Sequence, residues 1–472
     1  MTKPSQSPKA DFINDGKIEK ILREANKEST ADTAREIIEK ARSAQGLTPF
    51  ETAVLLYLED KDTLKLLFRV AHEIKEKIYG KRVVIFAPLY ISNFCVNNCY
   101  YCGYRTSNEI LRRRLEFDEI EKEVVALEAM GHKRIALEVG EDPKNCPIDY
   151  VLEAMRTIYG VKDKQGSIRR INVNIAATTV EEYRKLKEAG IGTYILFQET
   201  YHRGTYEKMH PAGPKRDYDW HTLAMDRAME GGIDDVGLGV LFGLYDYKYE
   251  VLATLLHSLH LEERFGVGCH TISVPRIRPA AGVTLETFPY LVKDDDFKKI
   301  VAIMRLAVPY TGMILSTREP AQFRDEVISL GISQISAGSC TGVGGYHKDI
   351  EGGAIATEGQ FQVEDTRSTD EMLQNICESG YIPSFCTACY RQGRTGDRFM
   401  PLAKSGEIQN ICQPNAILTF KEFLLDYASE KTRKVGEVVI AKHLGEIPNL
   451  KIREKTKDRL KQLEAGDRDL YF

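Results

Sequence analysis

Three closely spaced cysteines carry the clearest chemistry in this sequence. Cys95, Cys99 and Cys102 lie within the stretch CVNNCYYC. Thiolates are the soft ligands that iron–sulfur clusters require, and three of them can bind three corners of a four-iron cubane. The fourth iron is then open to another ligand. A structural zinc site usually takes four protein ligands and a disulfide framework pairs its cysteines, so both alternatives fit the motif less well.

A second group of cysteines lies near the other end of the chain. Cys386 and Cys389 form a CxxC motif, and Cys412 follows after 22 intervening residues. Three thiolates again indicate a cubane with one open iron. Zinc is the main alternative, because Cys377 or His347 could supply a fourth ligand. The sequence therefore predicts two metal centres, and the second is either an iron–sulfur cluster or zinc.

The composition argues against several classes of function. The chain has 472 residues and a formal net charge of −4, which gives no reason to expect nucleic acid or an anionic membrane as a partner. The N-terminal sequence is polar and shows no signal peptide, and the longest apolar stretches are shorter than the ~18 residues of a membrane helix. Ten cysteines in such a chain are expected in a reducing cytoplasm, and an oxygen-labile cluster suggests an anaerobic organism.

The elements that must position the cysteines alternate between short apolar runs and longer amphipathic ones. Eight strands are expected, over residues 83–89, 134–139, 171–176, 193–198, 236–242, 271–277, 313–317 and 334–337. Eight strands with intervening helices predict a (β/α)8 barrel, an α/β fold of the TIM type, and the alternative is a doubly wound open sheet. The predicted domains are a helical extension over 1–80, the barrel over 81–345 and a mainly helical, cluster-binding domain over 346–472.

Two further local features are expected outside the barrel. Thr48, Pro49 and Glu51 predict the start of a helix with a capping box. In the C-terminal domain, two charged segments are expected to be helices with solvated faces, over residues 421–433 and 453–465.

Polar residues gather where the predicted strands end, and the chemistry of such a barrel lies at the carboxyl ends of its strands. Gly140 and Glu141 end the second strand, where a glycine lets the backbone approach a ligand and a buried carboxylate needs a cationic partner such as an ammonium group. Arg318 follows the seventh strand and is the candidate for binding an amino-acid carboxylate. The fourth strand ends in the polar run Gln198-Glu199-Thr200-Tyr201.

The motif CxxxCxxC resembles the signature of the radical S-adenosylmethionine (SAM) enzymes. The segments VGE, PRIRPA, STRE and SAGSCTGVGGY are similar to the aromatic amino-acid lyases of that superfamily, and CTACYRQGRTGDRFM, with Cys412 at its spacing, resembles the tyrosine-cleaving [FeFe]-hydrogenase maturases. The resemblance implies a radical SAM barrel, with a 4Fe–4S cluster on Cys95, Cys99 and Cys102 that binds SAM and splits it to a 5′-deoxyadenosyl radical. The implied SAM-binding residues are Tyr101, Gly140, Glu141, Gln198, Glu199, Tyr201 and Arg278.

The same resemblance implies a reaction. The radical takes a hydrogen atom from the amino group of L-tyrosine, and the Cα–Cβ bond breaks to give p-cresol and dehydroglycine (2-iminoacetate). Dehydroglycine then yields carbon monoxide and cyanide for assembly of the hydrogenase H-cluster, on an additional iron near His270. That iron is attached to a second iron–sulfur cluster on Cys386, Cys389 and Cys412. The implied substrate-holding residues are Tyr90, Arg318 and a serine, either Ser336 or Ser339.

The two centres are expected at opposite ends of the barrel, because His270 begins the sixth strand while Arg276 and Arg278 end it. A fragment of the substrate would then have to cross an interior that is ordinarily filled with side chains. Small residues on three strands predict an internal tunnel, namely Ala176, Ala177, Gly237, Gly239 and the run Ala337-Gly338-Ser339.

The implied partners are L-tyrosine, an electron donor such as ferredoxin or flavodoxin, and other hydrogenase maturation proteins. Two other functions stay open at this point. A 2-iminoacetate synthase of thiazole biosynthesis would share the barrel motifs but would not need the second cysteine group. An iron–sulfur electron carrier or scaffold would need neither the polar strand ends nor a barrel of this size.

Overall fold

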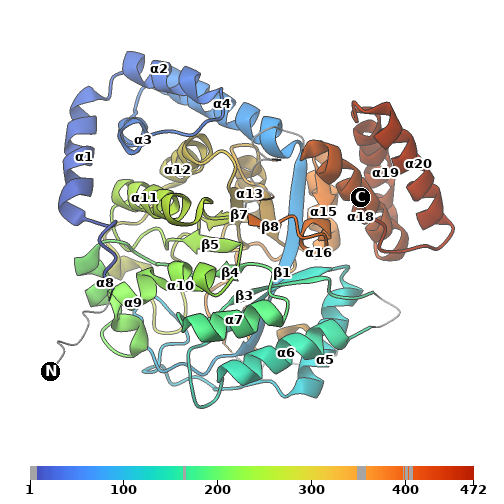
Figure 1. Cartoon of the computed structure of the whole chain (residues 1–472), viewed down its shortest axis with the longest axis horizontal. Helices are drawn as coiled ribbons and strands as arrows, with labels where there is room; N and C mark the ends of the chain where they lie inside the picture. Colours follow the sequence, from blue (N-terminus) through green and yellow to red (C-terminus); the bar gives the residue numbers. More distant parts are fainter. Residues whose placement is uncertain (1–7, 163–165, 348–357, 397, 399–401, 403–407) are drawn as a thin grey trace.

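A closed barrel of eight parallel strands forms the centre of the computed structural model, which describes residues 8–162, 166–347, 358–396, 398, 402 and 408–472 (Figure 1). Strands β2 to β8 follow one another around the barrel, and β1 closes it by pairing with both β8 and β2. The predicted (β/α)8 fold is confirmed and the open sheet is wrong. The strands are β1 Arg82–Ser92, β2 Arg134–Val139, β3 Arg170–Asn174, β4 Tyr194–Ile195, β5 Val236–Gly239, β6 Thr271–Ser273, β7 Gly312–Leu315 and β8 Gln334–Ser336.

The helices that follow the strands cover the outside of the barrel (Figure 1). In α5, for example, Ile120, Val124 and Leu127 are buried at helical spacing, and a capping box between Glu116 and Glu119 starts the helix. The barrel helices are α5 Phe117–Ala129, α6 Ile148–Gly160, α7 Val180–Glu188, α8 Arg203–Met209, α9 Tyr218–Thr222, α10 Ala224–Glu230, α11 Tyr247–Phe265, α12 Asp294–Ala307 and α13 Ala321–Ile328.

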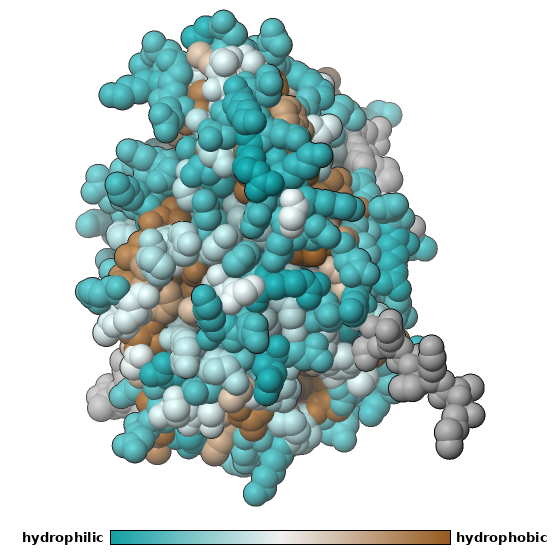
Figure 2. Space-filling view, turned by 90° about the vertical axis from the view of Figure 1, so that its left-hand side faces the viewer, coloured by the Kyte–Doolittle hydropathy of each residue, from teal (hydrophilic) through white to brown (hydrophobic). Residues whose placement is uncertain are grey.

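Four N-terminal helices pack on one side of the barrel, where they contact α11 and α12 (Figure 1). They are α1 Asp15–Glu28, α2 Ala31–Ala41, α3 Pro49–Leu56 and α4 Lys61–Tyr79. Helix α3 begins at Pro49, and the predicted capping box between Thr48 and Glu51 is present. None of the described helices combines the length and the hydropathy of a membrane span, and Figure 2 shows a mainly hydrophilic face with small, separate apolar patches.

A ninth strand, β9 Ile382–Ser384, attaches the C-terminal part of the chain to the barrel. It runs parallel to the start of β1, with Arg82 opposite Ile382 and Val84 opposite Ser384. The sequence prediction missed this strand, because three residues that include a proline carry no strand periodicity. Cys386 follows β9 by two residues, so the pairing places the second cysteine group at the amino ends of the barrel strands.

The remaining helices are α15 Thr369–Glu378, α16 Ala388–Arg391, α18 Gln409–Asp426, α19 Glu430–Gly445 and α20 Leu450–Glu464. The expected helix over 421–433 is wrong, because α18 ends at Asp426 and Ser429 caps the start of a new helix. Lys421 is also buried rather than solvated, and its Nζ lies 2.7 Å from Glu437 and 2.9 Å from Glu464. The segment 453–465 falls almost wholly within α20 and carries mostly exposed charges.

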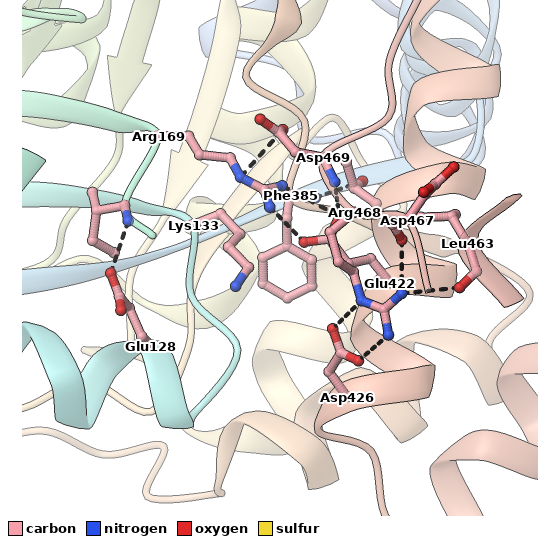
Figure 3. Close-up of polar contacts among 12 residues, drawn as sticks. Glu128, Lys133, Arg169, Phe385, Glu422, Asp426, Leu463, Asp467, Arg468 and Asp469 are labelled. Atoms are coloured by element: carbon pink, nitrogen blue, oxygen red, sulfur yellow. Dashed lines mark hydrogen bonds and ion pairs between the residues drawn. The ribbon is translucent and has the colours of Figure 1, made fainter. Parts of the chain in front are cut away.

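Ion pairs fix these helices to the barrel next to β3 (Figure 3). Arg169, which directly precedes β3, lies 2.6 Å from Glu422 on α18 and 3.3 Å from Asp469. Within the C-terminal part itself, Arg468 lies 2.6 Å from Asp426 at the end of α18. The Arg169–Glu422 pair is almost fully buried, so its loss would leave an uncompensated charge at this junction.

Candidate active site and second cysteine site

A cavity of about 200 Å³ lies inside the barrel toward the carboxyl ends of the strands, and we call it the upper cavity. Cys95, Cys99 and Cys102 line it together, on the loop that follows β1. Backbone hydrogen bonds hold this loop, from Val96 N to the Glu141 carbonyl (2.7 Å) and from Tyr100 N to the Met209 carbonyl (3.1 Å).

Two glycines allow the loop to pack so closely. A Cβ at Gly140 would lie 2.3 Å from the Phe94 carbonyl oxygen, and a Cβ at Gly213, whose φ is +93°, would lie 2.3 Å from Asn97 Oδ1. Gly140 lines the upper cavity as expected. The close approach that requires a glycine at this position is made by the cysteine loop.

Burial controls the protonation of the three thiols. It raises the pKa of Cys95 and Cys99, and it raises the pKa of Cys102 to about 11. The buried ammonium of Lys215 opposes this shift, and its Nζ lies 2.9 Å from Glu199 Oε1. Binding of a metal cluster must therefore displace protons from these cysteines. The sequence analysis missed Lys215, which lies in a short 3-10 turn and belongs to no motif.

Four of the seven residues expected to bind SAM line the upper cavity, namely Tyr101, Gly140, Glu141 and Glu199. Glu141 accepts a hydrogen bond from Asn97 Nδ2, and burial raises its pKa while Asn97 and Lys215 oppose the rise. The hydroxyl of Tyr101 lies 2.7 Å from His210 Nε2.

The other three, Gln198, Tyr201 and Arg278, do not line the cavity. Gln198 donates to Thr222 Oγ1 (2.9 Å), Tyr201 pairs with His257 Nδ1 (2.8 Å), and Arg278 lies 2.7 Å from Glu319. The backbone explains part of this result. Alternation along the chain directs Gln198 away from the cavity that Glu199 faces, and the left-handed φ of 68° at Glu199 interrupts the alternation that would otherwise direct Tyr201 to the same side as Glu199.

All the residues expected to hold the substrate line the same cavity, namely Tyr90, Arg318, Ser336 and Ser339. Tyr90 donates to Gln360 Oε1 (2.9 Å), and the Arg318 guanidinium lies 3.4 Å from the centre of the Phe361 ring. The two serines differ. Ser336 Oγ accepts a hydrogen bond from Thr317 N (3.1 Å), whereas the buried Ser339 Oγ has no hydrogen-bond partner among the described residues.

Besides Lys215, the cavity residues Glu138 on β2 and Asn174 on β3 were missed by the sequence analysis. They lie opposite each other in register, and Glu138 lies opposite Tyr90 of β1. Burial raises the pKa of Glu138 to about 8. A signal was present in the sequence, because Glu138 is a charged residue inside the otherwise apolar run Ile135-Ala136-Leu137-Glu138-Val139.

A second cavity of about 80 Å³, the lower cavity, lies at the amino ends of the strands. Cys386, Cys389 and Cys412 line it together with His270, whose Nδ1 lies 3.4 Å from Asp235. Within the described residues, no three His, Cys, Asp or Glu side chains form a group that could hold a single metal ion. Neither residue suggested as a fourth zinc ligand, Cys377 or His347, lines this cavity.

Positive charge dominates the lower cavity. Four arginines line it, three of them the first residues of their strands, namely Arg82, Arg134, Arg170 and Arg394. A hydrogen bond from Cys412 lowers the pKa of Cys389 to about 6 against the effect of burial, and Arg394 lowers it further. The pKa of Cys412 is raised in turn by the same hydrogen bond and by burial.

The expected small-residue tunnel does not form beside β5. A Cβ at Gly237 would lie 2.6 Å from Thr271 Oγ1, and a Cβ at Gly239 would lie 2.7 Å from Phe197 Cδ1. These glycines make room for neighbouring side chains, so the assignment of an open passage to them is wrong. Of the other small residues, Ala176 and Ser339 line the upper cavity.

The two cavities nevertheless approach each other closely. The upper cavity reaches Phe86, Ala136, Ile314 and Ser336, and the lower cavity reaches Val84, Arg134, Gly312 and Gln334. Each pair is two residues apart on one strand, a spacing of about 7 Å along the barrel. Side chains at neighbouring positions of the same strands therefore separate the two centres.

Comparison with known proteins agrees with this architecture. The model of the radical SAM superfamily matches residues 89–259, and the model of the biotin and thiamin synthesis associated domain matches residues 273–382. A crystal structure of HydG, a maturase of the [FeFe]-hydrogenase, is 66% identical, covers 98% of this chain and 100% of its own, and superposes with a TM-score of 0.95. The chain belongs to the HydG family of the radical SAM superfamily.

Two other relatives are more distant from this chain. The structure of HydG from Carboxydothermus hydrogenoformans is 39% identical, covers 95% of this chain and 99% of its own, and has a TM-score of 0.82. The 2-iminoacetate synthase of Escherichia coli (strain K12) is 33% identical over 354 residues, which are 73% of this chain and 89% of that protein.

Membership of the HydG family makes the chain a radical SAM enzyme, with SAM and a 4Fe–4S cluster as its cofactors. The upper cavity fits these groups. It brings three cysteines together and offers the carboxylates of Glu141 and Glu199, which suit the positive charges of SAM.

Proposed function

We propose that this protein cleaves the Cα–Cβ bond of L-tyrosine to p-cresol and dehydroglycine, and converts dehydroglycine to carbon monoxide and cyanide for assembly of the H-cluster of [FeFe]-hydrogenase. One observation carries the proposal. The chain has two three-cysteine cavities at opposite ends of one barrel, the first lined by candidate amino-acid-binding residues. The 66% sequence identity to a HydG of known structure supports the same function.

In the upper cavity, Cys95, Cys99 and Cys102 would hold the 4Fe–4S cluster. When bound, the cluster and SAM supply a 5′-deoxyadenosyl radical that removes a hydrogen atom from the substrate. Glu141 would accept hydrogen bonds from the SAM ammonium group, and Tyr101 would pack against the adenine. The ion pair between Glu199 and Lys215 keeps a carboxylate fixed on the same wall of the cavity.

The substrate would be held on the opposite side by its carboxylate. Arg318 stays charged and can bind a carboxylate with two hydrogen bonds, and its stacking on Phe361 fixes the plane of the guanidinium. Ser339 is the serine best suited to donate to the same carboxylate, because its buried Oγ has no other partner among the described residues. Ser336 is already bonded to Thr317 N.

In the lower cavity, Cys386, Cys389 and Cys412 would hold a second iron–sulfur cluster, and His270 would bind the additional iron. The four arginines that line this cavity lower the energy of anions, so they favour a small anion such as cyanide. Dehydroglycine formed above would need to pass only the side chains that separate the two cavities.

A 2-iminoacetate synthase that stops at dehydroglycine is the alternative that the Escherichia coli relative supports. The lower cavity argues against it, because that reaction does not need a second set of three cysteines. A carrier or scaffold for clusters is also less suitable, since it would not need the cavity residues Tyr90, Arg318 and Ser339.

The test is an anaerobic assay of the reconstituted protein with SAM, L-tyrosine and dithionite. We expect p-cresol and 5′-deoxyadenosine, followed by carbon monoxide and cyanide, from protein that carries about eight irons or slightly more. Formation of p-cresol without carbon monoxide or cyanide would support the synthase alternative. Full cluster loading without p-cresol would support a carrier. An electron donor such as ferredoxin or flavodoxin should replace dithionite, and other hydrogenase maturation proteins should take up the product.

A further inference from the structure

Glu138 is a half-buried carboxylate of the upper cavity to which the proposed reaction gives no task so far. It lies on β2, level with Tyr90 on β1 and Asn174 on β3 in the parallel register. Its side chain keeps part of its surface accessible, because it faces the cavity. Asn174 and the charge of Arg318 lower its pKa, and its own negative charge helps to raise the pKa of Tyr90 and Tyr104.

The other carboxylates that line the cavity, Glu141 and Glu199, are the ones proposed to face SAM. Glu199 forms an ion pair with Lys215, and Glu141 is bonded to Asn97 beside the first cysteine. Glu138 instead lies beside Tyr90, and it is close enough to Arg318 for that charge to lower its pKa, in the part of the cavity where the substrate is expected. A carboxylate and a guanidinium in one cavity are complementary to the two charges of an α-amino acid.

We propose that Glu138 is the general base that takes a proton from the α-ammonium group of the bound amino acid. The inference rests on the proposed function, because it concerns the same substrate and the same reaction. With the substrate carboxylate on Arg318, the ammonium group would lie one carbon away and could reach the carboxylate of Glu138, on which the charge of Arg318 acts.

The proton transfer balances without any further reactant. One N–H bond of the ammonium group breaks heterolytically, the proton forms an O–H bond on Glu138, and the electron pair stays on nitrogen. The products are a neutral amine and a neutral carboxylic acid. The amine N–H bond is weaker toward loss of a hydrogen atom than that of an ammonium group, since no nitrogen-centred cation is left behind. Glu138 therefore prepares the bond that the radical breaks.

The environment of Glu138 suits this task. Desolvation raises its pKa to about 8, while the hydrogen bond from Asn174 and the charge of Arg318 oppose the rise. A base with a pKa close to that of an amino group exchanges protons with it at little cost in free energy. Because the ionised form is the active one, kcat/KM should rise with pH through about 8.

The variant Glu138→Gln tests the inference by keeping the shape of the side chain and removing the base. We expect kcat for p-cresol formation to fall by roughly 10²- to 10⁴-fold, the usual contribution of a general base, and the rise with pH near 8 to disappear. Glu138→Asp should recover part of the rate and the pH dependence. Glu121→Gln, on the exposed side of α5, is the matched control and should behave as the wild type.

Iron content and 5′-deoxyadenosine formation in the absence of tyrosine report on folding and on the cofactor site. They should be unchanged in Glu138→Gln. If that variant is folded and loaded but keeps the wild-type rate or the wild-type pH profile, the inference is overturned. Failure of the proposed function looks different, because the wild-type protein itself would then form no p-cresol.

A substrate analogue decides which proton Glu138 takes. Ring-fluorinated tyrosines have a more acidic phenol, while their amino group is almost unchanged. We expect the loss caused by Glu138→Gln to be as large with the fluorinated substrate as with tyrosine. A loss that shrinks with fluorination would mean that Glu138 acts on the phenol, and the assignment to the ammonium group would be overturned.

Discussion

The two three-cysteine cavities offer the same ligands in opposite electrostatic surroundings. The upper cavity is lined by three carboxylates, and burial raises the pKa of each of its cysteines. The lower cavity is lined by four arginines, and while burial raises the pKa of Cys386 and Cys412 there as well, the hydrogen bond from Cys412 lowers the pKa of Cys389 to about 6. The difference separates two kinds of chemistry. The carboxylates of the upper site favour cationic groups such as the sulfonium and ammonium of SAM, beside the cations of Lys215 and Arg318, and the arginines of the lower site favour small anions.

The largest expected effects come from removing either set of cysteines. In Cys95→Ala/Cys99→Ala/Cys102→Ala, p-cresol and carbon monoxide should both be absent, because no radical can form. In Cys386→Ala/Cys389→Ala/Cys412→Ala, p-cresol should still form while carbon monoxide is lost. Each variant should lose about half of the iron. Product analysis and iron determination measure these outcomes.

Cys377→Ala is the control for the cysteine variants, because this buried thiol lies outside both cavities. It should keep both products and the full iron content. If Cys386→Ala/Cys389→Ala/Cys412→Ala also stops p-cresol formation while the upper cluster remains loaded, the two cavities do not carry out separate steps.

The second prediction concerns the buried cation of the upper site. Lys215→Met leaves Glu199 without its ion-pair partner in a nearly closed environment. Breaking one side of a buried pair costs about 3–5 kcal/mol, so the thermal unfolding midpoint of the apo-protein should fall clearly. The unfolding midpoint of the double variant Lys215→Met/Glu199→Gln should fall much less, since no unpaired charge remains in the cavity. Equal destabilisation of the two variants would show that the pair is not the cause.

The third prediction tests the cationic lower site. Arg394 lines the lower cavity and lowers the pKa of Cys389, and Arg394→Gln removes this charge, whose interaction with a thiolate is worth about 1.5–3 kcal/mol. Binding of iron at the lower cysteines should weaken by roughly 10- to 100-fold, as measured by chelator competition. Arg105→Gln, which removes a guanidinium far along the chain near the upper loop, is a charge-matched control. If Arg105→Gln weakens iron binding as much as Arg394→Gln does, the effect does not come from the charge of Arg394 in the lower cavity.

The barrel was predictable because its strands are short apolar runs separated by amphipathic helices, and each run is visible without tertiary information. Strand β9 was not predictable, because Ile382-Pro383-Ser384 becomes a strand only through its pairing with β1. The break between α18 and α19 was also missed, since charged residues continue through it.

In the candidate site, too, the features that depend on tertiary structure could not be predicted from the sequence. Motifs identified the cysteines and their neighbours, but the direction of Gln198 and Tyr201 depends on the left-handed backbone at Glu199. Lys215 reaches the cavity from an irregular segment that has no motif of its own. Glu138 could have been predicted from the sequence, because a charged residue inside an apolar strand indicates that its side chain faces a polar site.

The smallest expected effect separates the two serines of the upper cavity. Ser339→Ala should raise KM for tyrosine roughly tenfold, the effect of losing one hydrogen bond to a charged group, and leave the stability almost unchanged. Ser336→Ala removes the acceptor for the buried Thr317 N–H. It should lower the free energy of unfolding by about 1–3 kcal/mol with little change in KM. Steady-state kinetics and thermal unfolding of the two variants distinguish these roles. The opposite pattern would mean that Ser336 contacts the substrate and that Ser339 Oγ stays unpaired.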